Sequence, residues 1–198
     1  VTLQAVLQDA IFSLTKEQVK VVASGRTDAG VHAYKQVVHF DTNFEIPVDK
    51  FAFALNVLLP DDFKVIKSYT AGDDFHARFD VKQKTYVYKF YTSRVELPLC
   101  KNREYQVGFA CDEKKMQDVA GLFVRKYDFT PFCKVGKEDK DRVRTIYDCK
   151  VKQIEQNHYE IEITGNGFLH NMVRIIAGTI IDIGIGRIDY DYFKKALE

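Results

Sequence analysis

Helix, strand, strand, helix is the order of elements that the sequence predicts, and this order occurs twice. In the first copy, apolar residues at three- and four-residue spacing predict an amphipathic helix, at Leu3, Val6, Leu7, Ala10, Ile11 and Leu14. A short β-branched run around 19 to 24 and an alternation of polar and apolar residues from 36 to 41 predict two strands. Pro47 is then predicted to begin a second helix, which ends at Pro60. Four apolar side chains of this helix are expected to face the core, those of Phe51, Ala54, Leu55 and Leu58. Further strands are expected near 63 to 70 and 81 to 92.

The second copy begins after a loop near Pro98. Asp112 is a suitable N-cap for a helix that buries five apolar residues, Met116, Val119, Ala120, Phe123 and Val124. Two strands follow, and the second alternates buried and polar positions, with Tyr159, Ile161 and Ile163 against Glu160, Glu162 and Thr164. The run Gly165 to Gly167 turns the chain into a long apolar helix from about 168 to 184, and Asp189 caps a last short helix.

This repeat predicts an α+β fold of two ferredoxin-like βαββαβ units, with a mostly antiparallel sheet and helices on one face. The expected units are 1–97, which carries Asp28, and 98–198. The pattern fits only if the first strand of the first unit and the last strand of the second are missing. The sequence begins with Val1 and enters a helix at once, so we expect a fragment of a longer protein.

Composition places the chain among ordinary globular proteins, with 46% hydrophobic and 29% charged residues. No run approaches the roughly eighteen apolar residues of a membrane helix, and the first residues do not resemble a signal peptide. We therefore expect a cytoplasmic protein without a membrane partner. The four cysteines show neither a Cys-x-x-Cys pair nor histidines at zinc-finger spacing, so free thiols are expected.

The formal net charge of +1 does not by itself indicate a nucleic-acid-binding protein. Binding to RNA would require the basic residues to be segregated on one face. Clusters that could do this are Arg125 with Lys126, Lys134 with Lys137, and Lys140 with Arg142 and Arg144. Each cluster is interleaved with acidic residues, and such runs are more often solvated surface than a binding site.

The loop from Ser24 to Ala33 places Asp28 between Gly25 and Gly30 and next to Arg26. Glycines allow close approach of a substrate to the backbone, and a guanidinium favours the ionised carboxylate, which can act as a nucleophile or a metal ligand. His32 and Asp41 do not complete a recognisable ligand set, so no metal is expected. From the residues alone, a second interpretation stays open, in which Asp28 only stabilises its own turn.

The run Ser24 to Ala33 resembles the signature motif of the tRNA pseudouridine synthase A family, in which the aspartate is catalytic. Further segments resemble the same family in the same order, across essentially the whole chain: 55–56, 59–62, 75–80, 84–88, 128–132, 143–146 and 165–174. Two positions depart from the family pattern. Tyr127 stands where a histidine is common, and Lys84 replaces a common arginine, which exchanges a planar fork for a point charge at a site suited to phosphate.

The resemblance implies that the chain isomerises uridines of the tRNA anticodon stem-loop, about positions 38 to 40, to pseudouridine. Asp28 would be the nucleophile, attacking either the ribose C1′ or the uracil C6, and Arg26 would orient it or hold a phosphate. Tyr86 would stack on the flipped uracil and take part in proton transfer. Without the resemblance, the alternation of Tyr86 with Tyr88 and Phe90 indicates sheet packing.

Other candidates for RNA contacts are Lys84 and two histidine–arginine pairs. His170 and Arg174 are predicted one helical turn apart on a shared face, and His76 and Arg78 on one face of an extended segment. Packing of His170 and an ion pair of Arg174 is the alternative. His39 and His158 are interpreted as structural histidines.

No cofactor is expected, because phosphate-loop and dinucleotide-binding glycine motifs are not found in the sequence. The resemblance implies a tRNA substrate and a homodimer. It also implies an N-terminal strand before Val1, and a segment after Glu198 that adds an apolar residue to the active site. The alternatives are a non-catalytic RNA-binding protein of the same fold and a ferredoxin-like interaction module.

Overall fold

A computed structural model describes residues 2–134 and 141–197 of the chain. Internal contacts divide the chain into two compact units, unit 1 at Val1–Val81 and unit 2 at Lys82–Glu198. These units are defined by which residues contact one another, whereas the predicted units were defined by a repeated βαββαβ pattern, so the two divisions do not test each other. The predicted ferredoxin-like units at 1–97 and 98–198 therefore stay a prediction.

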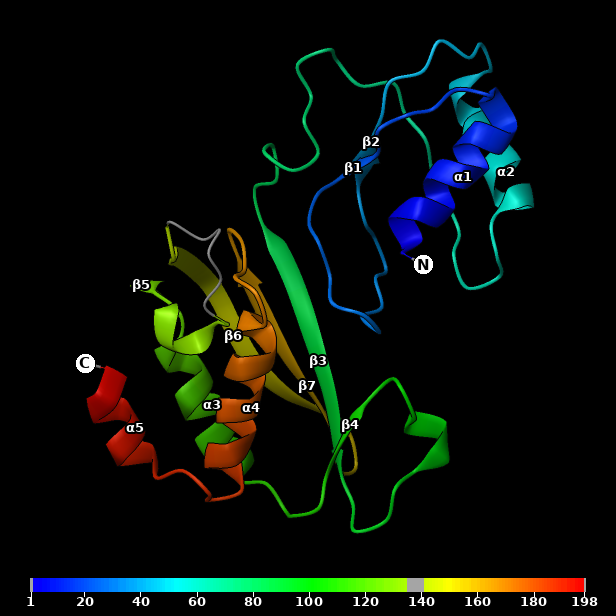
Figure 1. The fold of residues 1–198 in the computed structure, drawn as a ribbon. Coiled ribbons are helices and arrows are strands. Elements are labelled where there is room, and N and C mark those ends of the chain that lie inside the picture. The colour runs from blue at the N-terminus through cyan, green and yellow to red at the C-terminus, as the bar shows by residue number, and fades with distance from the viewer. Residues whose placement is uncertain (1, 135–140, 198) are drawn as a thin grey trace. The chain divides into compact units, whose positions relative to one another are not determined.

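Unit 1 consists of two helices and a small antiparallel ribbon (Figure 1). Helix α1 (Leu3–Thr15) and helix α2 (Val48–Leu58) pack together, and Thr2 caps α1 by accepting a hydrogen bond from the Ala5 N–H. Strands β1 (Val22–Ala23) and β2 (Val38–His39) form the ribbon. The core is made of apolar side chains from both helices and the segments beside them, Leu7, Ala10, Ile11, Val21, Phe51, Leu55 and Leu59. Both predicted helices are confirmed.

Three local predictions for unit 1 were wrong. The ribbon strands are shorter than predicted, and residues 63–70 form no strand. Asn56 of α2 explains the second difference, because its side-chain amide donates to the Val65 carbonyl (2.8 Å) and its Oδ1 accepts from the Val65 N–H (2.7 Å). Leu58 is 45% exposed and Leu59 is 5% exposed, since the chain leaves the helix at Leu59 in an extended conformation.

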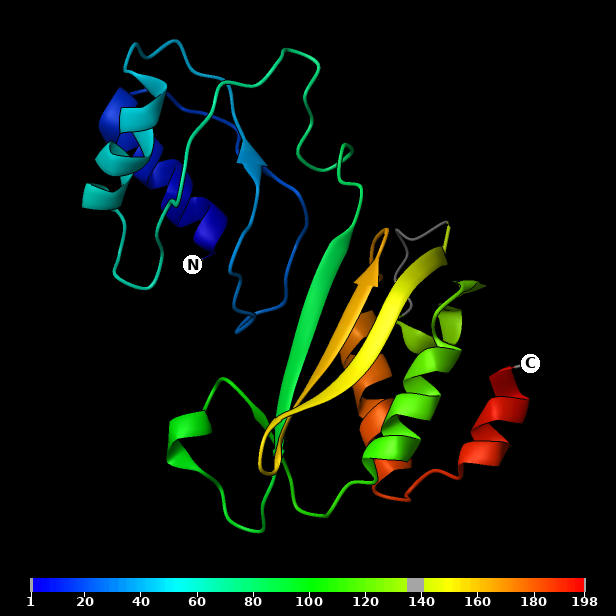
Figure 2. The same ribbon diagram turned by 180° about the vertical axis from the view of Figure 1, so that it is seen from behind.

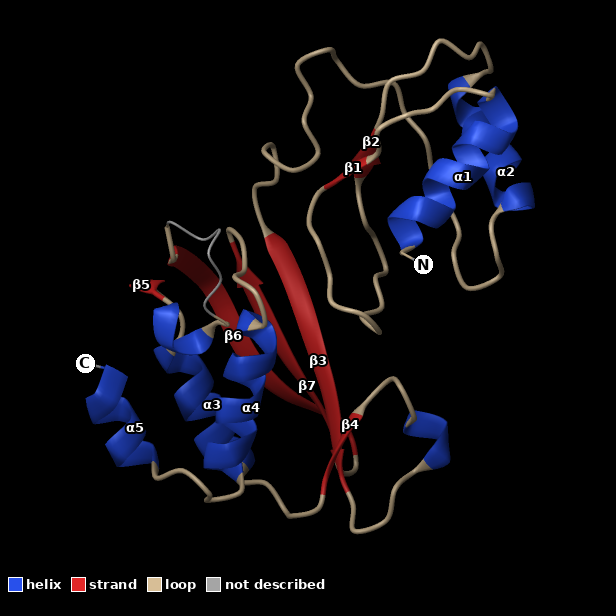
Figure 3. Cartoon of the chain, in the orientation of Figure 1, coloured by secondary structure: helices blue, strands red, loops and turns tan. Residues whose placement is uncertain are grey.

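Unit 2 is built on one five-stranded sheet, coloured red in Figure 3, with the order β4-β3-β7-β6-β5. The strands are β3 (Lys84–Thr92), β4 (Tyr105–Val107), β5 (Lys126–Asp128), β6 (Val143–Glu155) and β7 (His158–Gly165). Neighbouring strands are antiparallel except β3 and β4, which are parallel. Two single-turn 3₁₀ helices lie in the connections, η1 (Pro98–Cys100) and η2 (Thr130–Phe132).

Helices α3 (Glu113–Leu122) and α4 (Met172–Gly184) cover one face of this sheet, as Figures 1 and 2 show from opposite sides. Helix α5 (Tyr190–Leu197) packs beside α3. Asp112 and Asp189 both cap helices as predicted, by accepting from the backbone N–H of Lys115 and Tyr192. The α+β class is confirmed.

The strand and helix faces of unit 2 mostly follow the sequence pattern. Residues Tyr159, Ile161 and Ile163 of β7 are buried under the helices, as their alternation predicts. Two details were wrong: α4 begins at Met172 and not near 168, and the side chain of Val124 is exposed.

The other face of the sheet carries cross-strand ion pairs. Lys89 Nζ lies 2.8 Å from a Glu160 carboxylate oxygen, and Lys152 Nζ lies 3.1 Å from a Glu162 carboxylate oxygen. Partly exposed pairs of this kind add little to stability. On this face of the sheet, Lys89 and Lys152 are therefore each paired with a carboxylate.

Replacement of Cys149 tests the burial of the unit 2 core through pH dependence. Burial, and secondarily the charge of Asp148, raises the pKa of this thiol from 9.0 to about 12. An unfolded thiol ionises first, so the folded state loses stability as the pH rises from about 9 toward about 12. Chemical denaturation at about pH 8 and about pH 10.5 should show that the parent chain loses about 2 kcal/mol more stability over this interval than Cys149→Ala does. Equal losses in both proteins would contradict the assignment.

Candidate active site

The loop from Ser24 to Ala33 connects β1 to β2 in unit 1 and is fastened at its base. The Ser24 N–H donates to the Val37 carbonyl (2.9 Å), which continues the ribbon by one step. Gln36 Nε2 donates to the Gly25 carbonyl (2.6 Å), and Ser24 Oγ donates to Gln36 Oε1 (3.3 Å). Gln36, which follows the loop, therefore ties the start of the loop to the segment that leads into β2.

The tip of the loop is a turn around Asp28. The Val31 N–H donates to the Asp28 carbonyl (3.3 Å), and Gly30 has φ +81°, a conformation that side chains other than glycine rarely adopt. Asp28 is half-buried, whereas Arg26, Thr27 and the residues from 29 to 37 are exposed. A half-buried carboxylate at the exposed tip of a loop can meet a substrate while it stays partly shielded from water.

His39 and His76 bring a second segment of unit 1 against the ribbon. His39 Nδ1 accepts a hydrogen bond from the buried Ala77 N–H (3.1 Å), and the two imidazole rings meet edge-on at 4.9 Å. This bond supports the interpretation of His39 as a structural residue. Residues 75–80 thus lie beside β2, the strand that follows the Asp28 loop.

The predicted extended segment with His76 and Arg78 on one face was wrong. Residues 75–80 form tight turns, in which the Phe79 and Asp80 N–H groups both donate to the His76 carbonyl at 3.0 Å. His76 Nδ1 accepts from the Arg78 N–H (3.2 Å), and its ring stacks on Phe79 with centroids 4.1 Å apart. The guanidinium-bearing residue Arg78 is exposed, and the role of both residues in RNA binding stays a prediction.

In unit 2, Tyr86 lies half-buried on β3, opposite Ile163 of β7. Its ring meets the Phe168 ring edge-on, with centroids 5.1 Å apart and an interplanar angle of 79°. Tyr86, Tyr88 and Phe90 share one face, as predicted, and burial increases along the strand to the fully buried Phe90. The Tyr86 end of this face is thus the accessible end.

Phe168 is the partner of Tyr86 that the sequence interpretation missed. Its signal was an aromatic residue directly after the glycine-containing turn at 165–167. Edge-on packing of two aromatic rings favours one orientation of the Tyr86 ring.

Arg174 of α4 acts electrostatically on Tyr88, a neighbour of Tyr86 on the same face of β3. Burial raises the pKa of Tyr88, the Arg174 guanidinium counteracts part of that rise, and Tyr105 adds a smaller rise. Arg174 is exposed at the surface, and its charge acts on Tyr88 of β3.

His170 does not share a helical face with Arg174, and that prediction was wrong. The Met172 N–H donates to the Leu169 carbonyl (3.1 Å), and Asn171 has a left-handed backbone with φ 59°. His170 consequently sits in a turn before α4, exposed to solvent, and its carbonyl accepts from the Lys134 N–H (2.9 Å).

The glycine-containing turn that carries Phe168 is tied to β6. Asn166 exchanges two hydrogen bonds with Thr145, because its N–H donates to the Thr145 carbonyl (3.0 Å) and its Oδ1 accepts from the Thr145 N–H (2.9 Å). A Cβ atom at Gly165 would lie 2.8 Å from the Thr145 carbonyl oxygen. Lys84, at the start of β3, pairs with Gly165 in the sheet and is half-buried.

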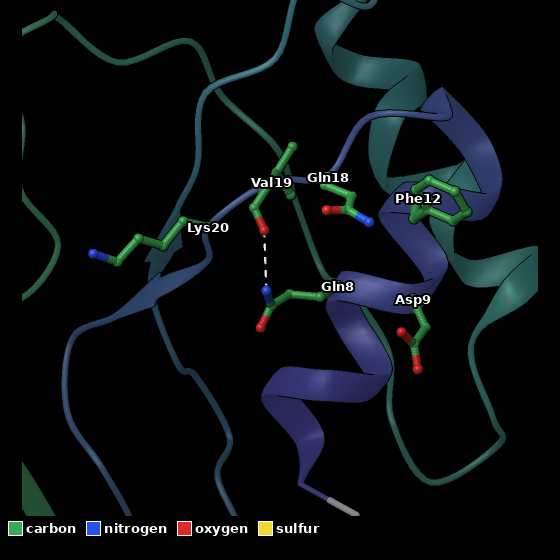
Figure 4. A pocket seen from close by; sticks show the side chains of 6 residues that line it. All are labelled: Gln8, Asp9, Phe12, Gln18, Val19 and Lys20. Atoms are coloured by element: carbon green, nitrogen blue, oxygen red, sulfur yellow. Dashed lines mark hydrogen bonds between the residues drawn. The ribbon is translucent and has the colours of Figure 1, made fainter.

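Other candidate features do not coincide with these residues. A surface hollow in unit 1, shown in Figure 4, is lined by Gln8, Asp9, Phe12, Gln18, Val19 and Lys20, none of which was predicted for the site. In unit 2, Arg125 has internal contacts, since its guanidinium lies over the Tyr127 ring at 4.3 Å and donates to the Leu197 carbonyl (3.2 Å). Lys137 and Lys140 lie outside the described residues. No helix within 2–134 or 141–197 has the length and apolar character of a membrane span.

A half-buried aspartate on a glycine-bracketed loop and an aromatic–arginine face on a sheet are features that suit an RNA-modifying enzyme. A sequence model of the tRNA pseudouridine synthase family matches residues 1–80 and 119–198. The chain belongs to this family, and its enzyme class is isomerase.

Curated relatives agree over nearly the whole chain. The tRNA pseudouridine synthase A of Bacillus pumilus is 42% identical over 198 residues, which cover 99% of this chain and 80% of the relative. The protein of the same name from Bacillus subtilis is 43% identical, covering 96% and 76%. The one from Caldicellulosiruptor saccharolyticus is 44% identical, covering 94% and 76%.

Replacement of Gly165 tests how tightly the Phe168 turn is held. A Cβ atom there must push the Thr145 carbonyl out of the ladder, so Gly165→Ala should lower the free energy of unfolding by about 1–3 kcal/mol. The matched control is Gly121→Ala in α3, where a Cβ atom has nothing within 4 Å and should raise stability by up to about 1 kcal/mol. Urea denaturation measures both, and equal stability of Gly165→Ala and the parent chain would contradict the described turn.

Proposed function

We propose that this chain isomerises uridines of the tRNA anticodon stem-loop, about positions 38 to 40, to pseudouridine, with Asp28 as the nucleophile. The observation that carries the proposal is the half-buried Asp28 in the loop from Ser24 to Ala33, which resembles the family signature and lies within the matched residues 1–80. Relatives that bear the name tRNA pseudouridine synthase A support the substrate and the reaction.

The reaction rearranges one base without loss or gain of atoms. The N1–C1′ glycosidic bond breaks, the uracil turns, and a C5–C1′ bond forms, while C5 loses a proton and N1 gains one. Asp28 attacks the ribose C1′ or the uracil C6 and is released again at the end of the cycle. The fastening of the loop by Gln36 supports this role, because a nucleophile must be held at a fixed distance from its target.

Arg26 and Tyr86 are assigned supporting roles at the reacting nucleotide. Arg26 orients the Asp28 carboxylate or holds a phosphate, and its exposure leaves it accessible to RNA. Tyr86 stacks on the uracil, which loses its neighbours when it leaves the RNA stack. Tyr86 is half-buried, so part of its side chain is accessible to solvent, which is consistent with that role.

The remaining predicted residues are assigned to the tRNA backbone. Arg78, His170 and Arg174 are exposed, and Lys84 and His76 are half-buried, so each has at least part of its surface accessible to solvent. A homodimer and a cytoplasmic location complete the proposal, and neither a metal nor an organic cofactor takes part in it.

Substitution of Asp28 tests the assignment of the nucleophile. With tRNA that carries tritium at uridine C5, the protein should release tritium to water, and Asp28→Asn should lower the rate by at least about a thousandfold. Asp73→Asn is the matched control, because Asp73 is an exposed loop carboxylate outside the segments that resemble the family, so this variant should leave the rate unchanged. Unfolding curves of both variants should coincide with that of the parent chain.

Two results would contradict the proposal. Undiminished release by a folded Asp28→Asn protein would exclude Asp28 as the nucleophile. Binding of tRNA without any release, by the parent chain on every tRNA offered, would instead favour a non-catalytic RNA-binding protein.

Substitution of Tyr86 separates stacking from proton transfer. Tyr86→Ala removes the ring and should cost about 1–3 kcal/mol of transition-state stabilisation, measured as the fall in kcat/KM. Tyr86→Phe keeps the ring, so any further loss in this variant reports the hydroxyl group. A Tyr86→Ala protein with full kcat/KM would exclude the stacking role.

A further inference from the structure

A thiol, a carboxylate and an imidazole meet in unit 2 and belong to no part of the proposed mechanism. Cys100 Sγ, a Glu104 carboxylate oxygen and a ring nitrogen of His158 all lie within 4.8 Å of one another. Cys100 ends the 3₁₀ helix η1, Glu104 directly precedes β4, and His158 begins β7. Three separate elements therefore converge at the end of the sheet where β4 begins (Figure 1).

Backbone hydrogen bonds hold the first two side chains at fixed spacing. The Arg103 and Glu104 N–H groups both donate to the Cys100 carbonyl at 3.0 Å. The residue between them and Cys100, Asn102, has φ 63°, which closes the turn tightly. Cys100 and Glu104 are thus placed on one short turn, with little freedom to separate.

The sheet fixes the third side chain. His158 pairs with Tyr91 of β3, and its ring stacks on the Tyr91 ring with centroids 5.7 Å apart and an interplanar angle of 26°. The Tyr91 hydroxyl in turn accepts from the Leu97 N–H (3.0 Å), at the entrance to η1. One tyrosine therefore contacts both the imidazole and the segment that leads to the thiol.

The three groups are sheltered and carry complementary chemistry. His158 Nδ1 lies 2.8 Å from Glu104 Oε2, and these side chains are 21% and 18% exposed. Cys100 is 9% exposed, and burial together with the neighbouring Glu104 raises the pKa of its thiol. A cation placed among them would neutralise the carboxylate and compensate for loss of the thiol proton.

We propose that Cys100 Sγ, the Glu104 carboxylate and His158 Nδ1 bind one divalent cation of the Zn²⁺ class. Sulfur, nitrogen and carboxylate oxygen are the donors that Zn²⁺ uses in proteins, whereas Mg²⁺ and Ca²⁺ bind oxygen ligands and avoid thiolates. Three protein ligands leave the fourth tetrahedral position for water. The Glu104–His158 contact widens by a few tenths of an ångström to admit the ion.

The bound ion has a structural consequence for unit 2. It links the turn at 100–104, which leads into β4, to the first residue of β7. β4 contributes only three residues to the sheet, Tyr105–Val107, so a metal link holds an edge that few hydrogen bonds secure.

Titration of the chelator-treated chain with Co²⁺ tests the site, because a Co²⁺–thiolate bond gives a near-ultraviolet charge-transfer band that other ligands do not. We expect one equivalent of Co²⁺ to produce the band, and Zn²⁺ to displace it and to raise Tm. Cys100→Ser should abolish the band. Glu104→Gln should keep the band and lower the Co²⁺ affinity at least about tenfold.

Matched controls separate the site from general effects of substitution. Cys111→Ser replaces a half-buried thiol outside the cluster, and Glu96→Gln removes an exposed carboxylate from the same connection. Both variants should bind Co²⁺ as the parent chain does, and circular dichroism should show that all four variants are folded. Absence of a stoichiometric band in the parent chain, or its persistence in Cys100→Ser, would overturn the proposal and leave a hydrogen-bonded structural trio.

Discussion

The pairing of β3 with β7 is the constraint on which unit 2 depends. It runs without a register shift from Lys84 opposite Gly165 to Tyr91 opposite His158. At one end, this register sets Tyr86 beside the turn that carries Phe168. At the other end, it stacks His158 on Tyr91 and brings the imidazole to Cys100 and Glu104. A one-residue slip would move each of these side chains to the opposite face of the sheet.

Much of the fold could be predicted because the spacing of apolar residues along a helix or strand indicates which of its faces is buried. The helices at the start of the chain and after Asp112, and the alternation through Tyr159 to Ile163, all follow from which positions are apolar. One prediction failed where a side chain took the place of backbone pairing. Asn56 takes both hydrogen-bonding groups of Val65, so residues 63–70 form no strand despite a suitable composition.

The site was predictable in part, and for different reasons in the two units. Asp28 could be found from its loop and the family resemblance, since a motif of consecutive residues can be recognised without knowledge of the tertiary structure. Phe168 beside Tyr86 depends on sheet register, and the left-handed Asn171 that separates His170 from α4 depends on local backbone geometry. The trio of Cys100, Glu104 and His158 could not be predicted from the short ligand spacings typical of metal-binding motifs, because the histidine lies 54 residues after the glutamate.

Asp28 is the centre of the account, and the most direct measurement separates its chemistry from tRNA binding. Stoichiometric protein is incubated with unmodified tRNA, pseudouridine is mapped along the RNA after digestion, and tRNA affinity is measured in parallel. The account predicts pseudouridine in the anticodon stem-loop with the parent chain, and unchanged uridine with an Asp28→Asn protein that binds the same tRNA equally well. Equal pseudouridine formation by both proteins would contradict it.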